Sequence, residues 1–393
     1  MTVRRVPVVL MRGGPLRAAC FLAHDLPTTP RARDALLIRA LGAPDTGGCV
    51  DGPGTGPDGV SRVLVVSRSQ RPDCDVDVLA GVVDPGSPTI DWSAPCGPLA
   101  AAVAPFAIAA RLFPAGDGTA RVRLQQVPDG ARMDAFVPVA GGEPADEGGF
   151  VEDGLAHPSP EIRLERIEPV DQPFPTGAVR EVLELPGGGV VDATLVAVDE
   201  PVVFVRADAL GLSGREQPGE LDRARRVHER IAAIRTLAAA RFGLASESAR
   251  GRGRVPVVCW VARPAPYRGV GGEVPADAID LLARCDVEGR LDAAPGGRVT
   301  AEIAVAAAVP GTVVAEVART LPGVATRIGH ASGAVAAAAD VGSRALGRGR
   351  EAWRVDRLVR SHGARRLLAG ELFVPVPAGS AGGARPAGSG GPG

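Results

Sequence analysis

The chain has 393 residues, 45% of them hydrophobic, and its 44 basic and 45 acidic side chains leave a formal net charge of -1. Charges of both signs are interspersed and aromatic residues make up only 3%, which excludes a nucleic-acid-binding protein built on a basic surface with stacked rings. No apolar stretch reaches the roughly 20 residues of a membrane-spanning helix. Every basic residue is an arginine, so lysine-based mechanisms are excluded as well.

The first half of the chain alternates predicted strands with two helices. Pro30, after two threonines, starts a helix that ends near Gly42. A second helix follows the turn at Cys96 and runs to about Leu112. Because this second helix consists almost entirely of small apolar residues, we expect it to be buried. Strands are predicted at residues 6–10, 60–66, 120–124, 135–139 and 162–165.

The second half repeats this order. A helix at 220–242 carries apolar residues at helical spacing and stops at Gly243. A glycine turn then opens another helix of small residues near Thr300. The repetition predicts an α+β protein of two similar domains, with a cleft where the two buried helices begin. Strands are predicted at 190–198, 202–205 and 255–261, with further strand-like runs at 324–330, 353–359 and 372–375.

These elements define the expected domain boundaries. The N-terminal domain is placed at 1–184 and the C-terminal domain at 185–375, with the last strands able to return to the first domain. Residues 376–393 consist mostly of Gly, Ala, Pro and Ser, so a disordered tail is predicted there. The chain opens on a strand-like run rather than on a cleavable leader, which favours a cytoplasmic location.

Cys96 is the residue of greatest chemical interest. It lies in a Pro-Cys-Gly-Pro turn directly before the first small-residue helix. Unpaired N–H groups and the dipole at a helix N-terminus favour a thiolate and can hold a carboxylate or an enolate oxygen. On these residues alone, a small buried packing residue is the alternative. The other cysteines show no CxxC pair or zinc-site spacing and are interpreted as structural: Cys20, Cys49, Cys74, Cys259 and Cys285.

Six short motifs follow one another between residues 6 and 375: Met11-Arg12-Gly13-Gly14, residues 24–27, residues 51–56, Cys96-Gly97, residues 201–205 and residues 328–333. In this order they resemble the PrpF family, which includes methylaconitate isomerases and 4-oxalomesaconate tautomerases. The resemblance implies the two-domain fold of diaminopimelate epimerase, in which each domain wraps a strongly curved sheet around a central helix. It also places the active cleft between the domains.

The activity implied by the resemblance is a cofactor-free isomerisation of an unsaturated carboxylic acid. An allylic 1,3-proton transfer would move the carbon–carbon double bond, with Cys96 at the position of the family cysteine as base or acid. Arg62 stands where the family has a lysine, and an arginine holds a carboxylate better than it moves a proton. We expect a substrate other than methylaconitate or oxalomesaconate, in a specialised or biosynthetic pathway. The alternative is a relative that has lost the chemistry and serves as an accessory or carboxylate-binding protein.

The remaining candidates are assigned by their place in these motifs. For Arg12 and Arg17, pairing with nearby acids is an equal alternative, and for His330 a structural role is the default. Asp292 and Glu302 are candidates for a second acid/base, with the interaction of a carboxylate with a helix start as the alternative. No metal, cofactor, nucleic acid or membrane partner is expected, and a homodimer is left open. The expected substrate-binding residues are Arg12, Gly13, Gly14, Arg17, Ser61, Arg62, Gly97, Arg298, Thr300 and His330.

Overall fold

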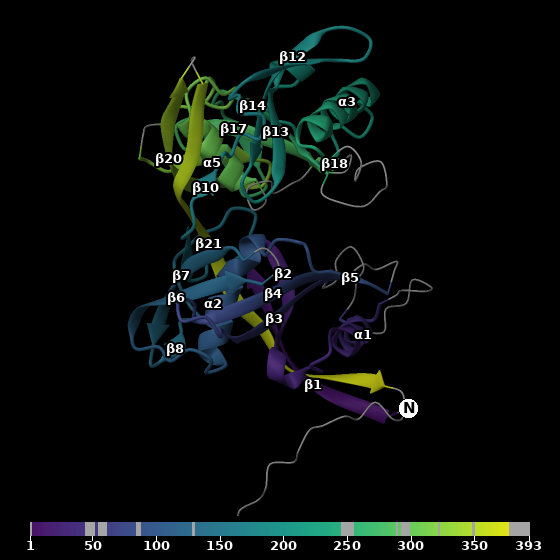
Figure 1. Ribbon diagram of the computed structural model, residues 1–393, viewed down its shortest axis with the longest axis vertical. Coiled ribbons are helices and arrows are strands. Elements are labelled where there is room, and N and C mark those ends of the chain that lie inside the picture. The colour runs from purple at the N-terminus through teal and green to yellow at the C-terminus, as the bar shows by residue number, and fades with distance from the viewer. Residues whose placement is uncertain are drawn as a thin grey trace, which may run out of the picture.

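The computed structural model describes residues 2–43, 52–53, 61–83, 88–127, 130–244, 255–287, 290–291, 299–320, 323–347 and 350–376. Two lobes are joined along one long strand, β21 (Arg350–Val376) (Figure 1). Most strands belong to one mixed sheet of 19 strands, while β15 (Tyr267–Gly269) and β16 (Gly272–Val274) pair separately. Within the described residues, no helix is long and apolar enough to cross a membrane.

The N-terminal lobe surrounds helix α2 (Ala100–Ala109), which a short 3-10 turn at Gly97–Leu99 precedes. Every side chain from Ala100 to Ile108 is buried, because the helix is apolar on all sides and its small residues let the sheet close around it. Helix α1 (Pro30–Ala40) covers the outer face of the sheet with a separate leucine-rich cluster. The strands are β1 (Thr2–Gly13), β2 (Leu16–Leu22), β3 (Arg62–Arg68), β4 (Val76–Val83), β5 (Ile90–Asp91), β6 (Gly118–Gln126), β7 (Arg132–Ala140), β8 (Glu143–Pro144) and β9 (Glu161–Arg166).

The C-terminal lobe has the same plan. Helix α5 (Thr300–Ala308) is enclosed by strands, and helix α3 (Arg225–Arg241) lies outside them (Figure 1). The strands are β10 (Val170–Asp171), β11 (Glu181–Glu184), β12 (Val190–Ala197), β13 (Pro201–Arg206), β14 (Val257–Ala262), β17 (Leu281–Val287), β18 (Arg290–Leu291), β19 (Thr326–His330) and β20 (Gly333–Gly347).

Strand β21 belongs to both lobes. Its first part pairs with β20 and β10, its middle with β9, and its last part with β1, so that Thr2 lies opposite Val376. Alternate residues of its middle part, from Leu358 to Ala364, are buried. Side chains of this strand therefore reach the interior where the two lobes meet.

Several element boundaries differ from the sequence predictions. The helix after Cys96 ends at Ala109 rather than near Leu112, where Arg111 adopts a left-handed φ of 59° that breaks the helix. Helix α3 begins at Arg225, five residues after the predicted start, because residues 218–223 form turns. Val376, predicted as the start of the tail, is the last residue of β21. Residues 377–393 lie outside the described residues.

Candidate active site

Cys96 lies directly before the 3-10 turn that leads into α2. Its side chain is 1% exposed, and its backbone N–H donates to Gln126 Oε1 at 2.7 Å. The next residue, Gly97, has a φ of +56°, and a Cβ built there would meet no atom within 4 Å. The turn therefore borders open space on the Gly97 side, while the thiol is buried against the core of the lobe.

The glycine motif of the first hairpin packs directly against this turn. A Cβ on Gly13 would lie 2.9 Å from Pro98 O and 3.0 Å from Leu99 Cα. Gly14 has a φ of +56°, and a Cβ there would lie 2.8 Å from Pro98 Cβ. Only glycine permits both the left-handed backbone and this close approach. Two motifs that are 80 residues apart in the sequence thus form one unit.

Other predicted residues lie at the same end of the sheet. Arg17 faces Arg12 across the β1–β2 hairpin. Strand β3 runs parallel to β2 with Ala19 opposite Val63, so Arg62 comes level with Ala18. Ser61, just before β3, accepts a hydrogen bond from Val83 N–H at 2.7 Å through its carbonyl oxygen. Arg62 therefore lies on the strand next to the β1–β2 hairpin, and a guanidinium group can attract a carboxylate.

Arg12 is engaged inside the protein. Its Nη1 donates to Gly14 O at 3.0 Å and its Nη2 to Ser159 Oγ at 3.1 Å. Burial lowers the pKa of Arg12, and the carboxylate of Glu152 opposes that effect. These contacts fasten the Gly14 turn to the loop before β9. In this structure, Arg12 shapes the turn through hydrogen bonds to a backbone carbonyl and a hydroxyl group.

Two residues missed by the sequence analysis, Glu152 and His362, lie at the same turn. Glu152 Oε1 is 3.0 Å from His362 Nδ1, and its Oε2 accepts the backbone N–H of Gly363 at 2.9 Å. His362 is 1% exposed, and its Nε2 has no hydrogen-bond partner among the described residues. A Cβ on Gly14 would lie 3.2 Å from both His362 Nδ1 and Glu152 Oε1. The scarcity of histidine, five in the chain, is the signal that could have drawn attention to His362.

The loop that carries Glu152 also contacts the C-terminal lobe. Ala334 N–H donates to Asp153 Oδ2 at 2.6 Å, and a Cβ on Gly154 would lie 2.9 Å from Ser332 Cβ. His330 is buried at the end of β19, opposite Gly333 in the β19–β20 hairpin. The motif at 328–333 is thereby joined through this loop to the Gly14 turn of the other lobe.

Helix α5 packs against β19 and β20. Thr300, its first residue, is 1% exposed, and its Oγ1 has no hydrogen-bond partner among the described residues. Glu302 Oε1 accepts the backbone N–H groups of Asp199 and Glu200, each at 2.8 Å. Burial, reinforced by the charge of Asp199, raises the pKa of Glu302 to about 7. The predicted candidates Asp292 and Arg298 lie outside the described residues.

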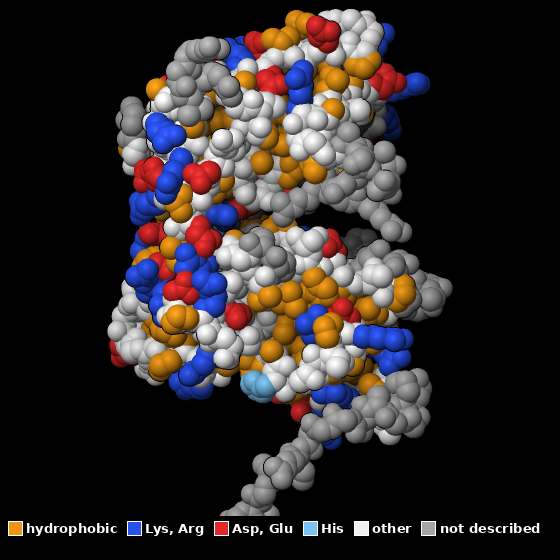
Figure 2. Space-filling model, in the orientation of Figure 1, with side chains coloured by type: hydrophobic (Ala, Val, Ile, Leu, Met, Phe, Trp, Pro, Cys, Tyr) orange, Lys and Arg blue, Asp and Glu red, His pale blue; other side chains and the backbone are white. Residues whose placement is uncertain are grey.

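Asp199 connects α5 with β21. Its carboxylate binds Arg166 at 2.7 Å and Arg360 at 2.8 Å. Arg360 and His362 are both buried on β21 and two residues apart, a separation of about 7 Å along a strand. His362 lies beside Gly14, which packs against the turn before α2, whereas Arg360 binds Asp199 in the turn held by Glu302 of α5. Both buried helices therefore begin near one short stretch of β21, and the surface is hollowed between the lobes (Figure 2).

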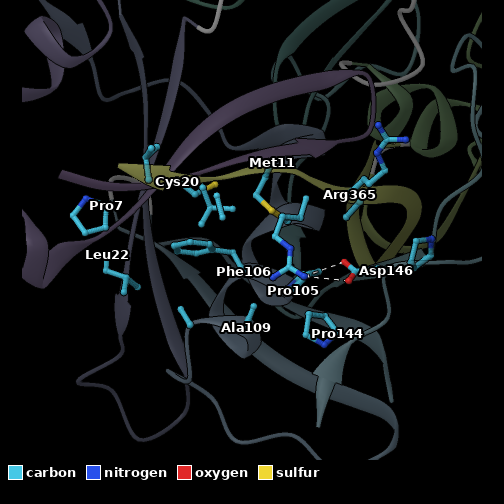
Figure 3. A pocket seen from close by; sticks show the side chains of 18 of the residues that line it. Pro7, Met11, Cys20, Leu22, Pro105, Phe106, Ala109, Pro144, Asp146 and Arg365 are labelled. Atoms are coloured by element: carbon cyan, nitrogen blue, oxygen red, sulfur yellow. Dashed lines mark hydrogen bonds and ion pairs between the residues drawn. The ribbon is translucent and has the colours of Figure 1, made fainter. Parts of the chain in front are cut away.

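A separate cavity of about 240 Å³ lies beside the second half of α2 (Figure 3). Its wall is apolar, with Met11 and Phe106 among the lining residues, and the described residues that line it do not include Cys96. Burial raises the pKa of Cys20, which also lines it, so this thiol stays protonated. Charged groups occur at its rim, where Arg366 binds Asp146 at 3.1 Å. The cavity does not offer the acid/base groups gathered around Gly14.

Comparison with known proteins covers almost the whole chain. A family model described as PrpF protein matches residues 3–375. The chain belongs to the PrpF family. A PrpF relative, the 2-methyl-aconitate isomerase of Cupriavidus necator, is 36% identical, over 94% of this chain and 97% of the relative. Further curated relatives are also named isomerases. This similarity identifies the chain as an isomerase, as the sequence predicted.

Solved structures confirm the predicted fold. A methylitaconate-delta-isomerase matches with a TM-score of 0.78 and 26% identity, covering 95% of this chain and 96% of the other. A hydroxyproline epimerase from Agrobacterium vitis matches with a TM-score of 0.52 over 95% of this chain and 92% of the other, at 12% identity. The second likeness concerns the fold alone. The PrpF chain thus has the α+β, epimerase-like architecture of two lobes, each built around a buried helix.

Proposed function

We propose that the protein is a cofactor-independent isomerase that moves a carbon–carbon double bond in an unsaturated carboxylic acid, with Cys96 as the base. The observation that carries the proposal is the turn before α2. There the thiol sits at the start of a buried helix, the Gly13-Gly14 backbone packs against it, and open space adjoins Gly97. The isomerases among the PrpF relatives act on methylaconitate and methylitaconate by name, which supports an acid of this class.

The reaction begins with removal of a proton from a carbon that a conjugated carboxylate activates. The thiolate of Cys96 takes this proton, so that a C–H bond breaks and an S–H bond forms. The electron pair moves into the conjugated system and gives an enolate-like intermediate. Positive charge from Arg17 and Arg62, together with the starts of α2 and α5, stabilises the oxygen that gains charge. A proton then returns at the other end of the allylic system.

The side chain of Arg62 indicates which chemical group of the substrate is bound. An arginine does not exchange its proton near neutral pH, but it binds carboxylates through two parallel hydrogen bonds. Placed level with Ala18 of the β1–β2 hairpin, it favours an acid with a carboxylate held at this edge of the sheet. We therefore propose a dicarboxylate or tricarboxylate substrate, with this arginine as an anchor.

Nuclear magnetic resonance in deuterated buffer tests the proposal with methylaconitate, methylitaconate, oxalomesaconate and related unsaturated acids. The wild type should isomerise at least one acid and incorporate deuterium. Cys96→Ala should lose about 100-fold to 10,000-fold of both rates, the range for loss of an acid/base group. Cys74→Ala, which removes another buried thiol of the same lobe, should stay within twofold of wild type.

Two outcomes would contradict the proposal. Exchange that continues unchanged in Cys96→Ala removes the thiol from the reaction. Calorimetric binding of these acids without any exchange in the wild type identifies a carboxylate-binding protein instead.

A further inference from the structure

We infer that His362, oriented by Glu152, is the second proton carrier of this site and delivers a proton to the carbon skeleton after Cys96 has removed one. The inference rests on the proposed isomerase function. It assigns the role that the sequence analysis left to Asp292 or Glu302. It also accounts for a buried pair of ionisable groups that the sequence motifs do not include.

The first support is the geometry of the pair. Both oxygens of Glu152 are engaged, one 3.0 Å from His362 Nδ1 and the other by Gly363 N–H at 2.9 Å. A carboxylate held in this way fixes the orientation of the ring and leaves Nε2 as the nitrogen that gains and loses a proton. Among the described residues Nε2 has no hydrogen-bond partner. Buried polar atoms are rarely left unsatisfied, and those that are often have a functional role.

The second support is the position of the ring. The Gly14 backbone is in contact with both the imidazole and Pro98, since a Cβ there would lie 3.2 Å from His362 Nδ1 and 2.8 Å from Pro98 Cβ. Gly14 thus adjoins both His362, which comes from β21, and the turn that carries the Cys96 thiol at the start of α2. Two carriers on different elements can reach different carbons of one substrate, as a 1,3-transfer demands.

Glu302 is the competing candidate. Its Oε1 accepts two backbone N–H groups from the β12–β13 turn, so the residue already serves to hold that turn. His362, in contrast, lies beside Gly14, which packs against Pro98 of the Cys96 turn.

The proton balance closes without an oxidant or a co-reactant. Cys96 thiolate takes a proton from the first carbon, and the double bond moves. Imidazolium Nε2–H then gives its proton to the third carbon, so that an N–H bond breaks and a C–H bond forms. The enzyme is left with a thiol and a neutral imidazole. Transfer of one proton from Sγ to Nε2, directly or through water, restores the starting state.

The test separates exchange from isomerisation in deuterated buffer. His362→Gln should lose product formation by about 100-fold or more, yet it should keep deuterium incorporation at the carbon that Cys96 deprotonates. This exchange should vanish in Cys96→Ala. Glu152→Gln should show the same uncoupling more mildly, because the ring keeps its place but loses its charged partner. His228→Gln is the control, since this histidine lies on α3, where its Nε2 is 2.8 Å from the carbonyl oxygen of Leu221, and the variant should stay within twofold of wild type.

The outcomes are distinct. Isomerisation within threefold of wild type in His362→Gln overturns the inference, and so does uncoupled exchange in Glu302→Gln but not in His362→Gln. If His362→Gln does not fold, as circular dichroism would show, Glu152→Gln decides: an unchanged ratio of exchange to isomerisation overturns the inference. A wild type that neither exchanges nor isomerises any of the acids refutes the proposed function itself, and the second carrier with it.

Discussion

At the residue scale, the site depends on two glycines with the same backbone conformation and different surroundings. Gly14 and Gly97 both have a φ of +56°. Gly14 is surrounded by Pro98, Glu152 and His362, whereas a side chain at Gly97 would enter open space. Comparison of the two positions therefore separates the cost of the backbone conformation from the cost of packing.

We predict that Gly97→Ala lowers the free energy of unfolding by about 1 kcal/mol, the cost of a left-handed alanine. Gly14→Ala should lose about 1 to 3 kcal/mol more, because its methyl group would lie 2.8 Å from Pro98 Cβ and displace neighbouring groups. Urea denaturation of both variants measures the difference. Equal losses would mean that the hairpin can move away from the α2 turn without cost.

Residues of the site differ in how far the sequence reveals them. Cys96, Gly13 and Gly14 belong to short motifs whose chemistry and backbone requirements are local, so they could be identified without a structure. Glu152 and His362 are 210 residues apart, and neither belongs to a motif of its own. Their pairing is created by the passage of β21 into the N-terminal lobe.

At the scale of single elements, α5 carries an ionisable group into the core. Glu302 is wholly buried in its first turn, and its pKa is raised to about 7 by burial and by Asp199. The charged group beside it is Asp199 of the β12–β13 turn, which in turn binds Arg166 of β9 and Arg360 of β21. Because the folded state holds the proton more tightly than the unfolded state, the contribution to stability is complete below about pH 4.5 and is lost as the pH rises through 7.

We predict that Glu302→Gln flattens the dependence of unfolding free energy on pH between pH 5 and 8. Glutamine keeps an oxygen to accept the N–H groups of Asp199 and Glu200, but it cannot ionise. Urea denaturation across this range should show wild-type stability falling with pH more steeply than that of the variant. Parallel curves would show that Glu302 does not titrate in the folded protein over this range.

Elements also differ in how well they follow from sequence. Helices α2 and α5 are predicted because a run rich in small apolar residues indicates a buried helix. Strand β17 was missed because it contains Arg284, which is wholly buried. Its Nε donates to Glu216 O at 2.7 Å and its Cζ lies 5.1 Å from the ring of Tyr267. Such tertiary partners make a charge tolerable in a buried strand, and sequence periodicity does not reveal them.

At the scale of the whole molecule, the ion pairs of Asp199 connect the two lobes. Its carboxylate joins Arg166 at the end of β9 to Arg360 on β21, and all three side chains are mostly buried. Each arginine is partly removed from water, so the Asp199 carboxylate compensates a charge that water solvates only in part.

We predict that Asp199→Asn lowers the free energy of unfolding by roughly 2 to 4 kcal/mol, because it leaves two partly buried guanidinium groups without their counter-ion. Asp340→Asn is the control: Asp340 lies 3.9 Å from Arg357 and is 52% exposed, so its removal should cost less than about 1 kcal/mol. Chemical denaturation of both variants tests the contrast. Similar losses of unfolding free energy in the two variants would show that the Asp199 ion pairs stabilise the protein no more than exposed surface pairs do.

Strand β21 also governs the order in which this protein can fold. Residues 2–13 of β1 pair with residues 364–376 of β21, so the N-terminal lobe completes its sheet with a segment synthesised after the whole C-terminal lobe. Contacts between such distant segments slow folding and leave strand edges exposed in the meantime. On the ribosome, β1 must therefore wait for β21 to emerge, and the Gly13-Gly14 turn, the histidine and the thiol of the site come together only in that late step.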